Sequence, residues 1–231
     1  MISGKRVIAA MLTALMAVTF TANTAVSVYA TGVTATENAQ TIDAQSTDAQ
    51  ALTPEEQKAQ ELQQVYDMPV ESNGYKDWPQ GPGTYGEAGI VMEVGTGAIL
   101  YAKNIDAHEY PASITKVLTA LVALENGQLT DNVTFSHDSV AFLQRGDSSV
   151  GLKEGNVITL DQAMHAMLLA SANEAAYAIG ESVGVNAGHD YNWFIEQMNS
   201  RCKELGGENS NFANTNGLHD PNHYTSAYDM A

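Results

Sequence analysis

The spacing of apolar positions changes near residue 110. Two short apolar runs, 88–93 and 98–102, lie on either side of Gly95-Thr96-Gly97 and predict a β-hairpin. From Pro111 to about Glu125, apolar residues recur at the three- and four-residue intervals of one helix face. Asn126-Gly127 ends this predicted helix. The residues of its apolar face are Ile114, Val117, Leu118, Leu121 and Val122, and they predict a central, buried helix.

The rest of the chain is mostly helical in pattern. A second short hairpin or loop region covers 133–158, and the capping box Thr159-Leu160-Asp161-Gln162 begins a helix that stops near Ser171. Further helices are predicted over 174–183, from Asp190 to Gly206-Gly207, and from Thr225 onwards. A lone hairpin is marginal as a sheet. The pattern therefore predicts an incomplete α/β (α+β) domain with an N-terminal β-hairpin and a helical block.

The first 30 residues have the pattern of a signal peptide. Lys5 and Arg6 precede an apolar run over 7–20, and Val28-Tyr29-Ala30 places small residues before a cleavage point after Ala30. The alternative is a retained membrane anchor, but the run is short for a spanning helix. We expect an exported protein, extracellular or in the cell envelope on the outer side of the cytoplasmic membrane.

The segment 31–84 is predicted to be an acidic low-complexity linker, because it is rich in polar residues and poor in large apolar ones as far as about residue 52. Thr53-Pro54-Glu55-Glu56 is a capping box with proline at the first helical position, which predicts a short helix near 54–67. The main domain is expected to cover 85–231.

Charge and cysteine content narrow the functional classes. The 231 residues carry a formal net charge of −17, and cleavage would remove two basic residues and no acidic ones, leaving −19. Such a chain repels nucleic acid and anionic lipid, so neither is an expected partner. The single cysteine, Cys202, excludes an internal disulfide. It lies in a helical pattern with Phe194 and Met198 and is predicted to be a core residue.

Ser113-Ile114-Thr115-Lys116 is the first candidate for chemistry. A serine and a lysine three positions apart lie on one helix face, so the Lys116 amine can reach the Ser113 hydroxyl. A serine hydroxyl needs a neighbouring base to become a nucleophile, and serine–lysine pairs are one recurring solution. The alternative is a chance pattern with a solvated lysine. The position at a helix N-terminus and the apolar flanks favour the chemical interpretation.

Ser171-Ala172-Asn173 is the second candidate. It lies between two predicted helices, where a loop presents side chains to a cleft. Ser171 could relay a proton between Lys116 and a leaving group, and Asn173 could bind both a substrate carbonyl and Lys116. The alternative is that Ser171 only caps the helix that follows. By contrast, His219 and His223 are not predicted to bind metal, because Pro221 between them disfavours a helix.

The order of several motifs resembles the penicillin-binding and serine β-lactamase superfamily, and most closely its serine-type D-alanyl-D-alanine carboxypeptidases. The resemblance covers about 88–231. Its motifs are Tyr110-Pro111-Ala112-Ser113-Ile114-Thr115-Lys116, Gly151-Leu152-Lys153-Glu154-Gly155, Leu168-Leu169-Ala170-Ser171-Ala172-Asn173-Glu174-Ala175-Ala176, Asn216-Gly217-Leu218 and His223-Tyr224-Thr225-Ser226-Ala227-Tyr228-Asp229-Met230-Ala231.

The resemblance implies a transpeptidase-like fold and two-step acyl transfer without a metal or organic cofactor. Ser113 would attack the carbonyl between the terminal D-alanines of a peptidoglycan stem peptide, with Lys116 as base. Ser171 would pass the proton to the departing D-alanine, and Asn173 would orient the substrate. Penicillins would acylate the same Ser113. No protein partner is implied.

Two departures from the family pattern bear on activity. Ala172 stands where the second motif usually has glycine, a small change that we expect to be tolerated. The third motif, Lys-Thr-Gly or His-Thr-Gly, is absent from this sequence. In the family it binds the substrate carboxylate, and its strand supplies an oxyanion donor. The resemblance therefore implies that the C-terminal strands of the fold are missing, and we expect the chain to be the N-terminal part of such an enzyme. The alternative is an inactive truncated homologue or wall-binding remnant.

A serine β-lactamase is the nearest competing enzyme. One major class hydrolyses its acyl-enzyme with a glutamate spaced as E-x-x-x-N after the second motif. Neither Glu204, followed four positions later by Glu208, nor Glu208, followed by Phe212, has this spacing. The sequence therefore favours a carboxypeptidase.

Overall fold

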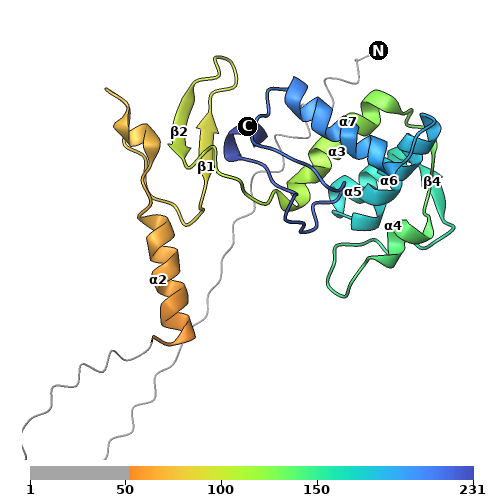
Figure 1. Ribbon diagram of the computed structural model, residues 1–231, viewed down its shortest axis with the longest axis horizontal. Coiled ribbons are helices and arrows are strands. Elements are labelled where there is room, and N and C mark those ends of the chain that lie inside the picture. Colours follow the sequence, from red (N-terminus) through yellow and green to blue (C-terminus); the bar gives the residue numbers. More distant parts are fainter. Residues whose placement is uncertain (1–51) are drawn as a thin grey trace, which may run out of the picture. The chain divides into compact units, whose positions relative to one another are not determined.

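The computed structural model describes residues 52–231, so the predicted signal peptide and the first part of the predicted linker lie outside the described residues. The described chain contains a hairpin, a helical block and a short second pair of strands (Figure 1). The elements are α2 Pro54–Tyr66, β1 Gly89–Met92, β2 Ile99–Lys103, α3 Thr115–Asn126, β3 Asn132–Thr134, α4 His137–Ala141, β4 Val157–Thr159, α5 Leu160–Leu169, α6 Asn173–Asn186, α7 Tyr191–Glu204 and α8 Ala227–Met230. None of the helices within 52–231 is both long and apolar enough to cross a bilayer.

The predicted hairpin and most helix starts are confirmed. Strands β1 and β2 pair antiparallel, from Gly89 opposite Lys103 to Met92 opposite Ile99, with an irregularity after Val91. The side chains of Thr53, Thr159 and Asp190 cap α2, α5 and α7 as the sequence predicts. The second predicted hairpin is two three-residue strands, β3 and β4, separated by α4 and a long loop.

The segment before the hairpin is bonded to it. Lys103, a fully buried residue at the end of β2, donates to the carbonyls of Val65 (2.6 Å), Thr84 (2.7 Å) and Gly86 (2.9 Å). The amide of Ala102 donates to the hydroxyl of buried Ser72 at 3.2 Å. Three backbone acceptors offset the cost of burying this ammonium group. The boundary of the main domain at residue 85 stays a prediction.

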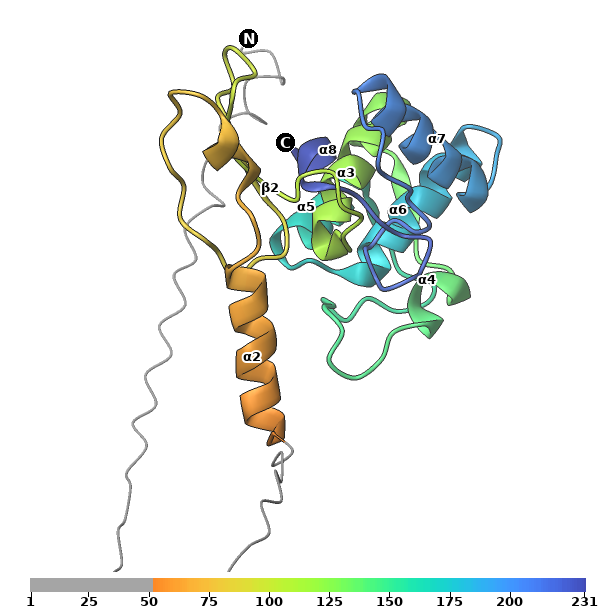
Figure 2. The same ribbon diagram turned by 60° about the vertical axis from the view of Figure 1, so that its left-hand side comes forward.

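The core lies between α3, α5, α6 and α7, which pack against one another (Figures 1 and 2). Alanines and glycines of α6 allow this close approach, and Phe194, Met198 and Cys202 of α7 are buried against it, so the core position of Cys202 is confirmed. The prediction for α3 is partly wrong. Ile114 and Val117 are 58% and 50% exposed, because α3 buries the face that carries Thr115, Lys116 and Thr119.

The end of the chain returns to the hairpin side of the molecule. Glu109 and Thr225 form an antiparallel bridge, with N–O distances of 2.7 and 2.8 Å, and the Tyr228 amide donates to the Ile105 carbonyl at 2.9 Å. The helix predicted from Thr225 is the one-turn helix α8, capped by Ser226 (Figure 2). These contacts hold the segment between α7 and α8 beside the start of α3.

Candidate active site

The structure brings the four predicted site residues together. Lys116 Nζ lies 3.1 Å from Ser113 Oγ and 2.9 Å from Asn173 Oδ1. The Ser171 hydroxyl donates to Ser113 Oγ at 2.8 Å. The Ser113 oxygen is therefore in contact with an amine from its own motif and a hydroxyl from the second motif, 58 positions later in the chain.

Ser113 lies just before the α-helix that carries Lys116. The sequence predicted a helix that opens at Pro111, whereas the structure has a 3₁₀ turn over Ala112–Ile114 and begins α3 at Thr115. Ala112 has a positive φ of 48°, an uncommon conformation for a residue with a side chain. Lys116 is in the first turn of α3, so the three-residue spacing still places its amine against the Ser113 hydroxyl.

Ser171 is not a helix cap. The N-cap of α6 is Ala172, which makes no side-chain capping bond, and the Ser171 hydroxyl is directed to Ser113 instead. Ser171 has a φ of 55°, in the left-handed region. The capping interpretation of Ser171 is therefore wrong, and the turn between α5 and α6 holds this hydroxyl at Ser113.

Lys116 is a buried amine with a perturbed protonation equilibrium. Only 2% of the residue is exposed, and its Nζ contacts three oxygens: Ser113 Oγ, Asn173 Oδ1 and the Asn216 carbonyl oxygen at 2.6 Å. Burial lowers the pKa of Lys116 to about 8, although the negative charge of Glu174 acts in the opposite direction. A substantial fraction of Lys116 is therefore neutral near pH 8, and a neutral amine can accept a proton.

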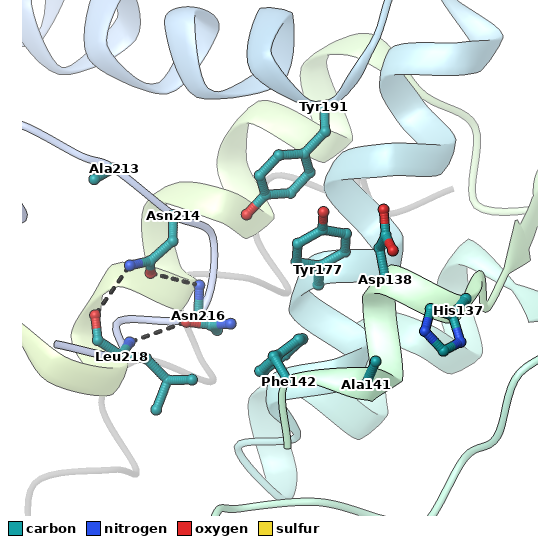
Figure 3. A pocket seen from close by; sticks show the side chains of 10 residues that line it. All are labelled: His137, Asp138, Ala141, Phe142, Tyr177, Tyr191, Ala213, Asn214, Asn216 and Leu218. Atoms are coloured by element: carbon teal, nitrogen blue, oxygen red, sulfur yellow. Dashed lines mark hydrogen bonds between the residues drawn. The ribbon is translucent and has the colours of Figure 1, made fainter. Parts of the chain in front are cut away.

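Sequence reasoning missed the role of the Asn216 carbonyl. Asn216-Gly217-Leu218 matches a motif of the family, but every residue has a main-chain carbonyl, so the sequence does not show which carbonyl contacts Lys116. The loop is held by the Asn214 side chain, which accepts from the amides of Asn216 (3.2 Å) and Gly217 (2.7 Å) and donates to the Leu218 carbonyl (2.9 Å) (Figure 3). The sequence signal for this loop is the glycine at position 217, because Gly217 has a φ of 83°, a conformation that favours glycine.

His223 fixes the same loop against α3. Its Nδ1 accepts from the Ala213 amide at 3.0 Å, so its Nε2 carries the proton and donates to Thr115 Oγ1 at 2.7 Å. The ring is 1% exposed, and burial lowers the pKa of His223 to about 4, against the opposing effect of Asp220. His223 is thus a neutral link between the loop and the residue next to Lys116, with both ring nitrogens bonded.

A pocket of about 560 Å³ adjoins the site through Asn216. The stacked rings of Tyr177 and Tyr191, with centroids 4.2 Å apart, form one part of its wall, and Asp138 of α4 lies beside them (Figure 3). The remaining lining comes from His137, Ala141 and Phe142 in and just after α4, and from the loop that ends at Leu218. Because Asn216 both lines this pocket and contacts Lys116 through its carbonyl, the pocket and the Ser113 site share one loop.

Comparison with known proteins decides the family. The sequence profile described as D-alanyl-D-alanine carboxypeptidase matches residues 79–231, about two thirds of the chain. The chain belongs to the D-alanyl-D-alanine carboxypeptidase family. The matched region contains all four predicted site residues, and the family resemblance predicted from their motifs is confirmed.

Individual carboxypeptidases of this family agree with the assignment. The chain is 35% identical over 150 residues to the D-alanyl-D-alanine carboxypeptidase DacF of Bacillus subtilis, covering 63% of this chain and 37% of DacF. Among solved structures, penicillin binding protein 5 of Haemophilus influenzae matches with a TM-score of 0.59 at 32% identity, covering 66% of this chain and 45% of that one. A D-alanyl-D-alanine carboxypeptidase of Mycobacterium tuberculosis matches with a TM-score of 0.55 at 28% identity, over 68% and 56% of the two chains.

These matches confirm the predicted fold class, since the structural relatives are penicillin-binding and carboxypeptidase proteins. The chain spans well under half the length of the first curated carboxypeptidases that it matches. Membership of the carboxypeptidase family is therefore established for the matched region, and the activity of the whole protein is treated below as a proposal.

Proposed function

We propose that the protein is an exported serine D-alanyl-D-alanine carboxypeptidase that removes the terminal D-alanine from peptidoglycan stem peptides through an acyl-enzyme on Ser113. The observation that carries this proposal is the contact of 3.1 Å between the Nζ of buried Lys116 and the Oγ of exposed Ser113. An amine whose pKa is about 8 is matched to proton transfer near neutral pH. Curated members of the family that match this chain carry the same activity in their names.

The three contacts of Lys116 support its role as a base. A neutral amine has two N–H groups and one lone pair. If the N–H groups donate to Asn173 Oδ1 and the Asn216 carbonyl, the lone pair is left for the Ser113 hydroxyl. The two acceptors would thus orient the base, and they would stabilise the ammonium group formed when it takes the proton.

The proposed first half-reaction uses this geometry. The Ser113 proton moves to Lys116 Nζ while Ser113 Oγ forms a bond to the carbonyl carbon between the two D-alanines. The C–N bond then breaks, and the proton held by Lys116 passes through the Ser171 hydroxyl, which lies 2.8 Å from Ser113 Oγ, to the leaving amine of D-alanine. In the second half-reaction, water adds to the ester, and the shortened peptide leaves as Ser113 recovers its proton.

Penicillins are proposed as inhibitors at the same residue. Their strained amide would be attacked by Ser113 in place of the peptide bond, and the ring would open without losing a leaving group. The ester would therefore remain on the enzyme longer than the peptide ester.

The proposed export rests on the N-terminal pattern, and a secreted mature chain that begins at Thr31 would support it.

Release of D-alanine tests the proposal. A synthetic peptide that ends in D-Ala-D-Ala is incubated with the full-length protein and with its Ser113→Ala variant as the matched control, and free D-alanine is measured. We expect release by the wild-type chain and none above background by the variant. Equal release by both proteins, or none by either, would contradict the proposed activity.

A further inference from the structure

Glu174 is a buried carboxylate that the proposed mechanism does not use. It follows Asn173 in the first turn of α6 and is fully buried. Its Oε1 accepts from the Ser149 hydroxyl (2.7 Å), the Val150 amide (2.8 Å) and the Gly151 amide (3.2 Å). Its Oε2 is buried without a hydrogen-bond partner among the described residues. A charge in this position is costly unless several donors surround it.

The bonds to Glu174 join the loop after α4 to the second motif. We call residues 148–151 the anchor segment. Glu174 receives three hydrogen bonds from this segment, and the Asn173 amide donates in the opposite direction to the Ser148 carbonyl at 2.9 Å. Asn173 and Glu174 of α6 therefore both bond to the anchor segment, Asn173 as a donor and Glu174 as an acceptor. Asn173 is also a direct partner of Lys116, so the anchor segment is tied to the residue that orients the amine.

The same carboxylate acts on Lys116 through its charge. The groups in contact with Lys116 Nζ, from Ser113, Asn173 and Asn216, are all uncharged. Glu174 is the charged group that acts on the amine, and its negative charge raises the pKa of Lys116 while burial lowers it. An ammonium group that forms when Ser113 gives up its proton would be stabilised by the same charge.

We propose that Glu174 is a positioning residue that anchors the 148–151 segment to the Ser171–Asn173 motif and places a buried carboxylate directly after Asn173, the residue whose Oδ1 contacts Lys116 Nζ at 2.9 Å. The inference about Lys116 rests on the proposed function, because it matters for catalysis only if Lys116 is the base. Glu174 itself does not touch the reacting atoms. Its two effects are separable, since glutamine keeps an oxygen acceptor and loses the charge, whereas alanine loses both.

A direct titration of Lys116 tests the charge effect without requiring activity. The ε-carbon signals of labelled lysine are followed by NMR against pH, and the Lys116 signal is assigned by its loss in Lys116→Arg. Glu174→Gln is expected to lower the pKa of Lys116 by about one unit, the lower end of the effect of a neighbouring opposite charge. Glu181→Gln is the matched control, since Glu181 lies two turns further along α6 and also has a buried Oε2 without a partner among the described residues.

The control separates a local effect from a loss of charge anywhere in α6. The Glu181 variant is expected to leave the pKa of Lys116 unchanged. An unchanged pKa in Glu174→Gln, or an equal fall in both variants, would overturn the proposed charge effect.

Amide exchange tests the anchoring effect. In Glu174→Ala, the amides of Val150 and Gly151 lose their acceptor, so we expect their exchange to accelerate by about tenfold or more. Glu174→Gln should retain most of the protection, because its amide oxygen can still accept. Glu181→Ala should leave both amides as protected as in the wild type. Unchanged exchange in Glu174→Ala would overturn the anchoring role.

The pH profile of penicillin acylation separates this inference from the proposed function. In Glu174→Gln the acidic limb of the pH–rate profile should move to lower pH, and the plateau rate should fall, because the Lys116 amine is less basic. A purely structural loss would lower the rate without moving the limb. If the wild type is acylated and the limb does not move in the variant, the inference is wrong and the function stands. If the wild type is not acylated at any pH, the function is wrong, and the titration and exchange still decide the role of Glu174.

Discussion

Gly217 lies so close to Ala112 that a Cβ added to Gly217 would fall well inside van der Waals distance of the Ala112 carbonyl oxygen. The loop that carries the Asn216 carbonyl is thus in direct contact with the backbone just before Ser113. The same added Cβ would be 3.1 Å from the Ser113 amide nitrogen. Glycine is required here for space as well as for its φ of 83°.

Substitution of Gly217 should damage both the fold and the site. We expect Gly217→Ala to lower the free energy of unfolding and to abolish penicillin acylation, because the loop must move away from Ala112. Gly155→Ala is the matched control, since Gly155 has the same φ of 83° and nothing within 4 Å of an added Cβ. That control should lose only about 1–2 kcal/mol from backbone strain and retain acylation. Denaturant unfolding and acylation rates measure the two effects, and equal losses in both variants would contradict the close contact.

The rate of acylation should depend on the protonation of Lys116. The amine is a base only when neutral, so the rate should rise with pH and level off above about 8, the pKa to which burial lowers this group. Lys116→Arg keeps a positive charge but no usable base, and we expect it to lose at least roughly 100-fold in rate. Rates measured from pH 6 to 10 check this. A flat profile in the wild type, or an active arginine variant, would show that Lys116 is not the base.

Ser171 should affect chemistry more than stability. Because Ser171 makes no capping bond and its hydroxyl contacts Ser113 Oγ, Ser171→Ala should slow acylation by about 100-fold while changing the unfolding midpoint little. A capping serine would show the opposite result, with about 1 kcal/mol lost and the rate retained. Acylation kinetics and thermal unfolding of the same preparation distinguish the two outcomes.

His223 should make the fold sensitive to acid. Its folded pKa is about 4 against an ordinary value of 6.5, so below pH 6.5 the unfolded chain binds a proton that the folded chain does not. This group should therefore reduce stability as pH falls from 6.5 to 4, by roughly 3 kcal/mol in total. His223→Gln should be less stable at neutral pH and should lose less on acidification.

Chemical denaturation at pH 7, 5.5 and 4 measures this effect. His165→Gln is the control, because His165 is more than half exposed and its Nδ1 contacts Asp161 of the same helix, α5. It should retain the wild-type pH dependence. An equal acid sensitivity in all three proteins would contradict the assignment to His223.

Most of the correct fold predictions came from local sequence features such as turn residues and helix caps. The hairpin around Gly95-Thr96-Gly97 and the caps at Thr159 and Asp190 depend on short-range chemistry, so the sequence alone predicted them. The exposure of Ile114 and Val117 could not be predicted this way, because an apolar stripe shows that a helix has two faces but not which one its neighbours cover. Ser113 also lies in a 3₁₀ turn, where the pattern predicted regular helix.

The candidate site likewise has a part that the sequence predicted and a part that it did not. The motifs predicted four side chains, and in the structure three hydrogen bonds join them in the order Ser171, Ser113, Lys116 and Asn173. The Asn216 carbonyl was not predicted, because any residue has a carbonyl and the contact with Lys116 joins positions 100 residues apart. Tertiary packing, rather than residue type, determines that part of the site.

The mass of the chain after exposure to a penicillin is the most direct test of the central claim. We predict that the full-length wild-type protein gains the mass of one intact penicillin, that peptide mapping places the adduct on Ser113, and that Ser113→Ala gains nothing. An unmodified wild-type chain, or an adduct on any other residue, would contradict the assignment of Ser113 as the nucleophile.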